Sequence, residues 1–129
     1  MSTRSALADN ELAQIFKKHA VAFRRARAAN LSFLVCFGQA RLRVSVLNGA
    51  VAAVDDLAVL PPLQSYDFSV KADADAWCRF WQRMPEAGSH DIFALTRYGH
   101  MAIEGNLYPL MANLQFVKDL LAVGRGELP

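Results

Sequence analysis

Cysteines, long hydrophobic runs and targeting segments are scarce or missing in this sequence. Its two cysteines, Cys36 and Cys78, are too few for a disulfide framework and lack metal-ligand spacing, so we expect buried free thiols. The longest stretches without a charged residue, 28–40 and 105–117, fall short of the roughly 20 apolar residues that span a bilayer. Neither end carries a recognisable secretory or other address. These absences predict a cytoplasmic protein, and the length of 129 residues predicts a single domain over 1–129.

Signatures of nucleotide-binding loops, zinc-dependent hydrolases and activated nucleophiles are also absent. The three histidines, His19, His90 and His100, are scattered, and the His100/Glu104 pair on one strand face has no predictable third ligand. Asp67 and Glu104 are the only carboxylates well inside predicted strands, and both lie on the polar face of their strand. The sequence therefore predicts no catalytic residue, no metal and no cofactor, and we expect a protein that is not an enzyme.

A strong excess of one charge is missing as well, because the net charge is only +2. Basic residues cluster near the N-terminus: Lys17, Lys18, Arg24, Arg25 and Arg27. Aromatic residues do not interleave with them on the exposed face of the predicted helix, and the small net charge steers weakly toward polyanions. We therefore expect no nucleic-acid binding and, at most, transient contact with a membrane or an acidic partner.

The first half of the chain predicts a helix followed by three strands. Helical spacing of apolar residues indicates an amphipathic helix from Asp9 to about Ala29, with Asp9 as its N-cap. The mostly apolar run Leu31–Phe37 predicts a strand in the middle of a sheet. Apolar and polar residues alternate over Arg41–Leu47, and the run Ala50–Val54 follows after Asn48-Gly49. Both residues of that pair tolerate positive φ, so the second and third strands should form an antiparallel hairpin.

The second half alternates strands with helices. Two prolines predict an extended crossing loop over 57–63, and alternation predicts a fourth strand over 65–71. Asp73 is placed to cap a helix that carries Trp77, Phe80, Trp81 and Met84 at helical spacing. A short helix over 91–98 and a fifth strand over 100–104 follow. The order predicts an α+β fold with a mainly antiparallel sheet.

The last quarter of the chain carries more apolar surface than one packing face needs. Gly105-Asn106 supplies a turn and an N-cap for a predicted helix over 107–121. Its stripe at helical spacing consists of Leu107, Leu110, Met111, Leu114, Val117 and Leu121, and Phe116 and Leu120 lie beside it. Such a helix must cover a core, line a cavity or meet a partner.

Three features together resemble the sterol carrier protein 2 family of lipid-binding domains. They are the hairpin Arg41–Val54, the alternating strand Tyr66–Val70 before the Trp77 helix, and the segment Met101–Leu107, in which a short strand and Gly-Asn precede a hydrophobic final helix. The similarity spans about residues 10–121. The C-terminus lacks the peroxisomal tripeptide of eukaryotic carriers, which suggests a bacterial protein.

The resemblance implies a five-stranded, mainly antiparallel sheet covered on one side by helices, with an apolar tunnel under the final helix. It implies non-enzymatic binding of a fatty acid, an acyl-CoA or a sterol-like lipid. The candidate ligand-binding residues of that tunnel are Trp77, Trp81, Phe93, Leu110, Met111, Leu114, Phe116 and Leu120.

Two other functions stay open at this point. The spare apolar surface could form a homodimer interface, or dock an enzyme that acts on hydrophobic substrates. The chain could also be a small isomerase or cyclase if Asp67 or Glu104 lay inside a cavity, where burial raises the pKa of a carboxylate.

Overall fold

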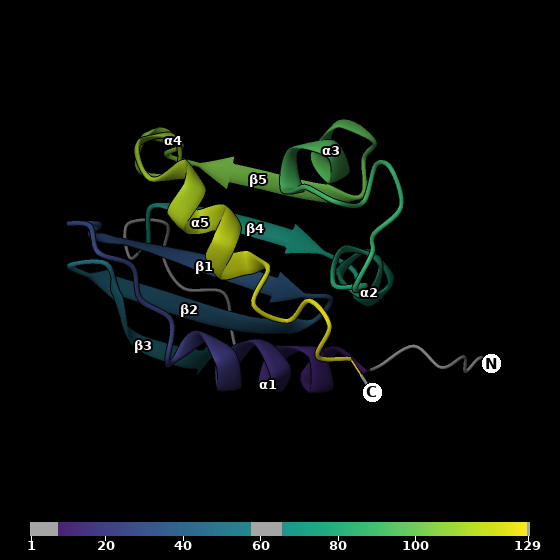
Figure 1. The fold of residues 1–129 in the computed structure, drawn as a ribbon, viewed down its shortest axis with the longest axis horizontal. Coiled ribbons are helices and arrows are strands. Elements are labelled where there is room, and N and C mark those ends of the chain that lie inside the picture. The colour runs from purple at the N-terminus through teal and green to yellow at the C-terminus, as the bar shows by residue number, and fades with distance from the viewer. Residues whose placement is uncertain (1–7, 58–65, 129) are drawn as a thin grey trace.

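A computed structural model describes residues 8–57 and 66–128, and Figure 1 shows their arrangement. The first half contains α1 (Asp9–Ala20), β1 (Leu31–Phe37), β2 (Ala40–Leu47) and β3 (Ala50–Leu57). The second half contains β4 (Phe68–Ala72), α2 (Ala74–Phe80), α3 (Ile92–Arg97), β5 (Met101–Gly105), α4 (Tyr108–Ala112) and α5 (Leu114–Leu121). None of the helices formed by the described residues has the length and hydrophobicity that crossing a bilayer requires.

The five strands form one sheet in the order β3-β2-β1-β4-β5. All neighbours are antiparallel except β1 and β4, which run parallel with Phe33 opposite Phe68 and Val35 opposite Val70. Helices cover one side of this sheet, and α5 crosses it (Figure 1). The predicted α+β class and the mainly antiparallel, five-stranded sheet are confirmed.

Two local predictions are confirmed by backbone geometry. Asn48 and Gly49 have φ of 52° and 77° between the paired strands β2 and β3, which is the left-handed geometry of a tight hairpin turn. The carboxylate of Asp73 accepts a hydrogen bond from the Ala76 N–H at 2.8 Å, so Asp73 is the N-cap of α2. The predicted loop around Pro61 and Pro62 lies outside the described residues.

The first helix is shorter than predicted. It ends at Ala20 rather than near Ala29, and Arg24 forms an isolated bridge with Ala50 at the start of β3. Phe23 and Ala29 are buried although they lie outside a helix, so tertiary packing rather than helical periodicity explains their spacing. The predicted N-cap is also wrong: Ala8 holds that position, and the Asp9 carboxylate instead accepts from the Gln39 N–H at 2.8 Å.

The predicted final helix is broken into α4 and α5 at Asn113. The side chain of Asn113 donates to the Pro109 carbonyl at 3.0 Å, and its backbone leaves helical geometry at φ −126°. A side chain that bonds to a carbonyl four residues back competes with the regular ladder of a helix. Because of this break, the predicted apolar stripe does not face the sheet as one continuous surface.

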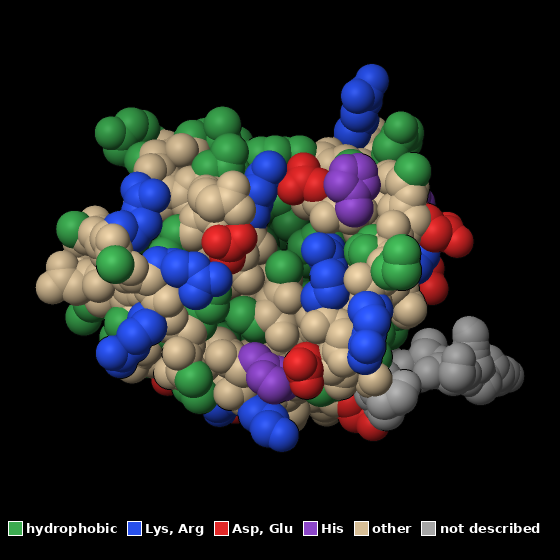
Figure 2. Space-filling view, viewed as in Figure 1, with side chains coloured by type: hydrophobic (Ala, Val, Ile, Leu, Met, Phe, Trp, Pro, Cys, Tyr) green, Lys and Arg blue, Asp and Glu red, His purple; other side chains and the backbone are tan. Residues whose placement is uncertain are grey.

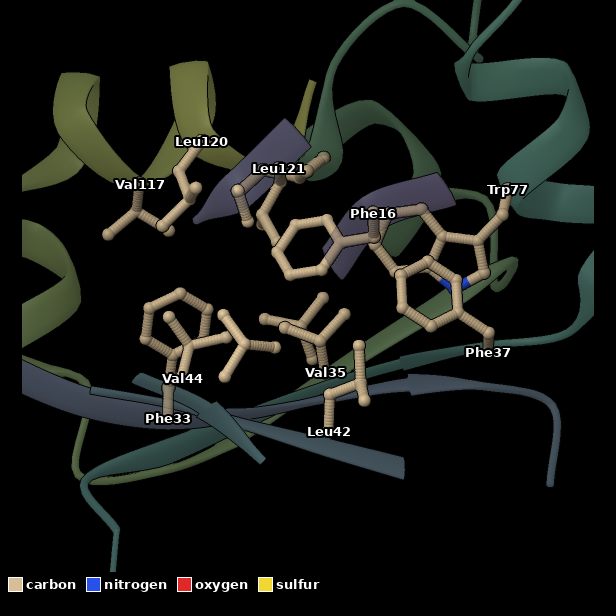
Figure 3. Close-up of a cluster of buried hydrophobic side chains, with 14 of the residues drawn as sticks. Phe16, Phe33, Val35, Phe37, Leu42, Val44, Trp77, Val117, Leu120 and Leu121 are labelled. Atoms are coloured by element: carbon tan, nitrogen blue, oxygen red, sulfur yellow. The ribbon is translucent and has the colours of Figure 1, made fainter. Parts of the chain in front are cut away.

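The core lies between the sheet and the helices (Figure 3). Side chains of the sheet, including Phe33, Val35 and Leu42, meet Val117 and Leu120 from α5. The Phe33 and Phe68 rings of the parallel pair stack at 4.9 Å between centroids, which fixes the middle of the sheet.

Candidate functional site

A surface groove separates α5 from the start of α3 (Figure 2). It has a volume of about 360 Å³, within the range of small-molecule sites. Its lining comes from the end of α2, the start of α3, and α5 with the residues that follow it: Phe80, His90, Asp91, Ile92, Gln115, Lys118, Asp119, Ala122 and Arg125.

Two residues of the hydrophobic core lie under this groove. Phe80 and Ile92 line it and are also members of the hydrophobic core, where they are 2% and 0% exposed. Ala122 contributes a small side chain that packs against the same core. The groove therefore lies directly over the core, but these core side chains are closed to solvent and most of the accessible lining is polar.

The upper rim is closed by Lys118. Its Nζ lies 3.1 Å from Asp91 Oδ1, and it also lies 5.1 Å from the centroid of the Phe93 ring. The side chains of Lys118 and Asp91 are 29% and 28% exposed, so solvent screens their pair. Contacts of this kind contribute on the order of 1 kcal/mol or less, and they tie α5 to α3 only weakly.

The lower rim is formed by Arg125. Its guanidinium donates two hydrogen bonds to the Phe80 carbonyl, at 2.8 and 3.1 Å, and one to the His90 carbonyl at 3.2 Å. It also lies 4.8 Å from the centroid of the Phe80 ring. Burial lowers the pKa of Arg125, which Asp91 partly offsets, yet a guanidinium stays protonated at physiological pH.

In the part of the chain that the structure describes, Arg125 lacks a direct ion pair, although Asp91 lies close enough to interact with its charge. Within the described ranges, no carboxylate lies within ion-pair distance of it, whereas Asp91 pairs with Lys118 and Asp119 Oδ2 lies 3.7 Å from Arg25 Nε. A partly buried cation held by carbonyls and an aromatic ring can still gain stability from an anionic partner. The groove therefore lies over the core and carries at its rim a cation that has no direct ion pair among the described residues.

The two candidate tryptophans, Trp77 and Trp81, are fully buried, and each of them joins two elements through a hydrogen bond. The Trp77 indole N–H donates to the Cys36 carbonyl at 2.9 Å and ties α2 to β1, and the Trp81 indole N–H donates to the Leu121 carbonyl at 2.8 Å. Gly124 packs against Trp81, since a Cβ built at this position would lie 2.4 Å from the indole ring. Trp81 thus fixes the end of α5 to α2.

The structure separates the remaining candidate residues into three groups. Leu110, Phe116 and Leu120 are buried, and Phe116 meets the Phe23 ring edge-on at 5.2 Å between centroids. Phe93 and Leu114 are half-buried beside the core. Met111 is 56% exposed and therefore lies outside the buried layer beneath α5. The role of all eight candidates in binding a ligand stays a prediction.

Neither carboxylate on which the enzyme alternative depends lies in a buried acid site. The Asp67 carboxylate accepts from the Ser32 N–H at 3.0 Å, which is a structural role at the start of two strands. Glu104 is exposed, and its Oε1 lies 3.4 Å from Lys71 Nζ. This geometry gives neither residue the apolar surroundings of a general base.

A second hollow, of about 340 Å³, includes Cys36, Gly38 and Lys71 in its lining. Burial raises the pKa of the Cys36 thiol, although Lys71 and Arg41 oppose the shift. A thiol that stays protonated at neutral pH is a poor nucleophile. The described residues also contain no group of three His, Cys, Asp or Glu side chains that could hold a metal.

Solved structures with this architecture include two with sterol carrier protein 2 in their description. The crystal structure of sterol carrier protein 2 matches with a TM-score of 0.63 and 16% sequence identity, over 89% of this chain and 94% of that one. A structure described as "UbiJ-SCP2 Ubiquinone synthesis protein" matches with a TM-score of 0.50 and 18% identity, over 89% and 93%. The chain has the sterol carrier protein 2 fold.

Comparison by sequence adds nothing to this assignment, because no family model matches the chain and no significant match to a curated protein was found. Within the sterol carrier protein 2 fold, sequence reasoning found the apolar side of the final segment but missed the polar rim of the groove. Lys118 and Arg125 were available as signals, since they are basic residues in or just after the most apolar helix. Their convergence with Asp91 and His90 depends on how α5 lies over α3, which the sequence pattern did not specify.

Proposed function

We propose that this protein binds a hydrophobic or amphipathic small molecule between α5 and the sheet, without catalysing a reaction. The main support is the groove beside α5, whose base consists of core side chains and whose rim is closed by screened polar contacts. The sterol carrier protein 2 fold agrees with a lipid ligand. In this proposal the ligand enters between α5 and α3 and displaces core side chains beneath α5.

The rim favours a ligand with an anionic end. Arg125 has no carboxylate partner among residues 8–57 and 66–128, so a fatty acid or an acyl-CoA would complete its charge interactions. A neutral sterol would leave Arg125 without an ion-pair partner. We therefore place fatty acids and fatty acyl thioesters before sterol-like lipids among the ligands expected for this site.

An accessory role beside an enzyme that acts on hydrophobic substrates is the second candidate. It is supported by the fold shared with a protein described as a ubiquinone synthesis protein, which names a hydrophobic product. In that case the ligand would be a prenylated quinone or its precursor. Denaturing extraction of the purified protein, followed by mass spectrometry, distinguishes a bound fatty acid from a bound quinone.

The binding test uses a fluorescent fatty acid and two matched variants. Ala122→Trp fills the groove, whereas Ala112→Trp places the same side chain at an exposed position of α4. We expect micromolar binding by the wild type and by Ala112→Trp, and at least a tenfold loss for Ala122→Trp. Absence of binding in the wild type, or equal binding by both variants, would contradict the proposed site.

Arg125→Met tests the preference for an anionic end. This variant should lose affinity for a fatty acid, about tenfold for a charge-assisted hydrogen bond, and keep its affinity for the fatty alcohol of the same length. The alcohol also serves as a control for correct folding. Equal losses for both ligands would show that Arg125 does not select for an anionic end.

A further inference from the structure

Three segments that are distant in sequence meet at one end of the molecule. They are the loop that carries Arg24, Arg25 and Arg27, the β2–β3 turn with Leu47, and α4 with Leu107 just before it (Figure 1). The Arg25 N–H donates to the Gly49 carbonyl at 2.8 Å, and Arg27 Nη2 lies 3.4 Å from the Ala112 carbonyl. We call the surface formed by Arg24, Arg25, Arg27, Leu47, Leu107, Tyr108 and Met111 the α4 surface.

Large apolar side chains protrude from this surface. Leu47 is 62% exposed, Leu107 41%, Tyr108 77% and Met111 56%. They come from a hairpin turn and from a five-residue helix with its flank, where little backbone is available to bury them. Leu107, Tyr108 and Met111 lie within about one turn of α4, and neighbouring exposed apolar side chains favour an interaction site.

The charge of the α4 surface is positive. Neither Arg24 nor Arg27 has a carboxylate within ion-pair distance in the described part of the chain, and Arg25 Nε lies 3.7 Å from Asp119 Oδ2. The Arg25 guanidinium also lies 4.3 Å from the centroid of the Phe23 ring, which holds it in place. Figure 2 shows Lys or Arg side chains at the end of the molecule that carries α4, with hydrophobic side chains near them.

We propose that the α4 surface docks the protein on anionic lipid bilayers. Interfacial binding grows with buried apolar area and with attraction between basic residues and anionic lipids, and tyrosine favours the headgroup region. From the sequence alone we expect at most transient membrane contact by these arginines, since the predicted helix shows no aromatic residues interleaved with them. The fold removes that objection, because α4 and the β2–β3 turn bring the apolar side chains from elsewhere.

A bilayer suits this surface better than an acidic protein does. The apolar side chains come from a turn and from a short helix that are distant in sequence, and arginines belong to the same surface, so it lacks the uncharged apolar centre typical of protein interfaces. A fluid headgroup layer can receive such separate side chains without a matching shape. This docking does not depend on the proposed ligand site, although α5 follows α4 directly in the chain.

Co-sedimentation of the full chain with lipid vesicles tests the proposal. The vesicles contain phosphatidylcholine alone, or phosphatidylcholine mixed with phosphatidylglycerol. We expect binding to the mixed vesicles that decreases as salt is raised, and much weaker binding to phosphatidylcholine. Arg24→Gln with Arg27→Gln should weaken binding by roughly twentyfold, since each basic residue contributes about a fivefold change near such a surface.

The chain offers matched controls at other exposed positions. Tyr98 and Met84 are 61% and 88% exposed and lie outside the α4 surface, as do the exposed Arg83 and Arg97. Tyr108→Ser with Met111→Ser should weaken vesicle binding by about tenfold or more, while Tyr98→Ser with Met84→Ser leaves it unchanged. Arg83→Gln with Arg97→Gln should likewise have little effect.

Three results would overturn the proposal. They are no binding to mixed vesicles, equal losses for the α4 surface and control variants, and a wild type that dimerises through Tyr108 and Met111 while ignoring vesicles. Fatty acid binding by the Tyr108→Ser, Met111→Ser variant is measured in parallel. Fatty acid binding by this variant should equal that of the wild type. The two measurements therefore distinguish a failure of membrane docking from a failure of the proposed ligand site.

Discussion

The segments α4 and α5 are both rich in apolar residues, yet they use them in opposite ways. In α5, Phe116, Val117, Leu120 and Leu121 are at most 2% exposed, whereas in α4 Tyr108 and Met111 are 77% and 56% exposed. The break at Asn113 separates them and turns the two helices in different directions. Hydrophobic composition alone therefore does not decide whether such a segment builds a core or a surface.

The difference also separates two proposed functions. Helix α5 lies over the sheet with its apolar side chains in the core, and its polar residues Gln115, Lys118 and Asp119 line the groove. Helix α4 lies at the end of the molecule beside Arg27, and its exposed Tyr108 and Met111 are the side chains that we propose to meet a bilayer. Substitutions of the buried residues of α5 should therefore change stability strongly, and substitutions of the exposed Tyr108 and Met111 of α4 should change it little.

The largest expected loss of stability follows truncation of Trp81, whose side chain holds the end of α5. Trp81→Ala leaves a large cavity and removes the hydrogen bond to the Leu121 carbonyl, so it should lower the free energy of unfolding by about 3–5 kcal/mol. Tyr108→Ala in α4 should change it by less than about 0.5 kcal/mol. Urea unfolding followed by circular dichroism measures both. Similar values for the two variants would contradict the contrast between the helices.

Truncation within the two helices is the next test. Leu120→Ala removes a fully buried side chain of α5 and should cost about 2–5 kcal/mol, depending on how far the core relaxes. Met111→Ala removes a side chain of comparable size that is mostly in water, so we expect a change within about 0.5 kcal/mol. Thermal unfolding of the two variants measures both changes. A loss of more than about 1 kcal/mol for Met111→Ala would mean that the Met111 side chain packs against the protein.

Overpacking at the end of α5 should have a smaller effect. Gly124→Ala places a Cβ at 2.4 Å from the Trp81 ring, and we expect a loss of about 1–3 kcal/mol. In a Trp81→Leu background the same substitution should cost less, because the ring it meets is gone. Chemical unfolding of the four proteins of this double-mutant cycle provides the coupling free energy. A strictly additive cycle would show that Trp81 is not the group that requires glycine here.

The smallest expected effect concerns the outer rim of the groove. Lys118→Met removes the screened pair with Asp91 and should lower stability by at most about 1 kcal/mol, a difference that shrinks at high salt. Lys18→Met on the exposed side of α1 is the control. Unfolding at two salt concentrations distinguishes them. A loss of several kcal/mol for Lys118→Met would show that the contact between α5 and α3 stabilises the protein more than we expect.

The sequence predicted much of the fold, because short-range signals agreed with long-range packing in most elements. The Asn48-Gly49 hairpin, the Asp73 cap and the strand Leu31–Phe37 are local patterns whose physical basis lies within a few residues. The ends of α1 were predicted wrongly, because buried residues after the helix mimic helical spacing. The break at Asn113 was missed, because a single side-chain hydrogen bond marks the end of α4 there.

The candidate site could be predicted only in part. Apolar spacing located the buried side of α5, because Phe116 and Leu120 carry that information in their own positions. The groove depends on Arg125 reaching the Phe80 and His90 carbonyls and on Lys118 reaching Asp91. Those contacts join residues 27 to 45 positions apart and are set by the tertiary packing of α5, which no local pattern encodes.

Photolabelling tests the central claim most directly. A fatty acid with a diazirine in its acyl chain would be bound to the full-length protein, activated by light, and located by peptide mass spectrometry. The proposed site predicts that the label lies in α5, residues 114–125, and at the facing start of α3, and that excess unlabelled fatty acid removes it. Labelling confined to α4 or to other surface residues, or labelling that competitor does not reduce, would contradict it.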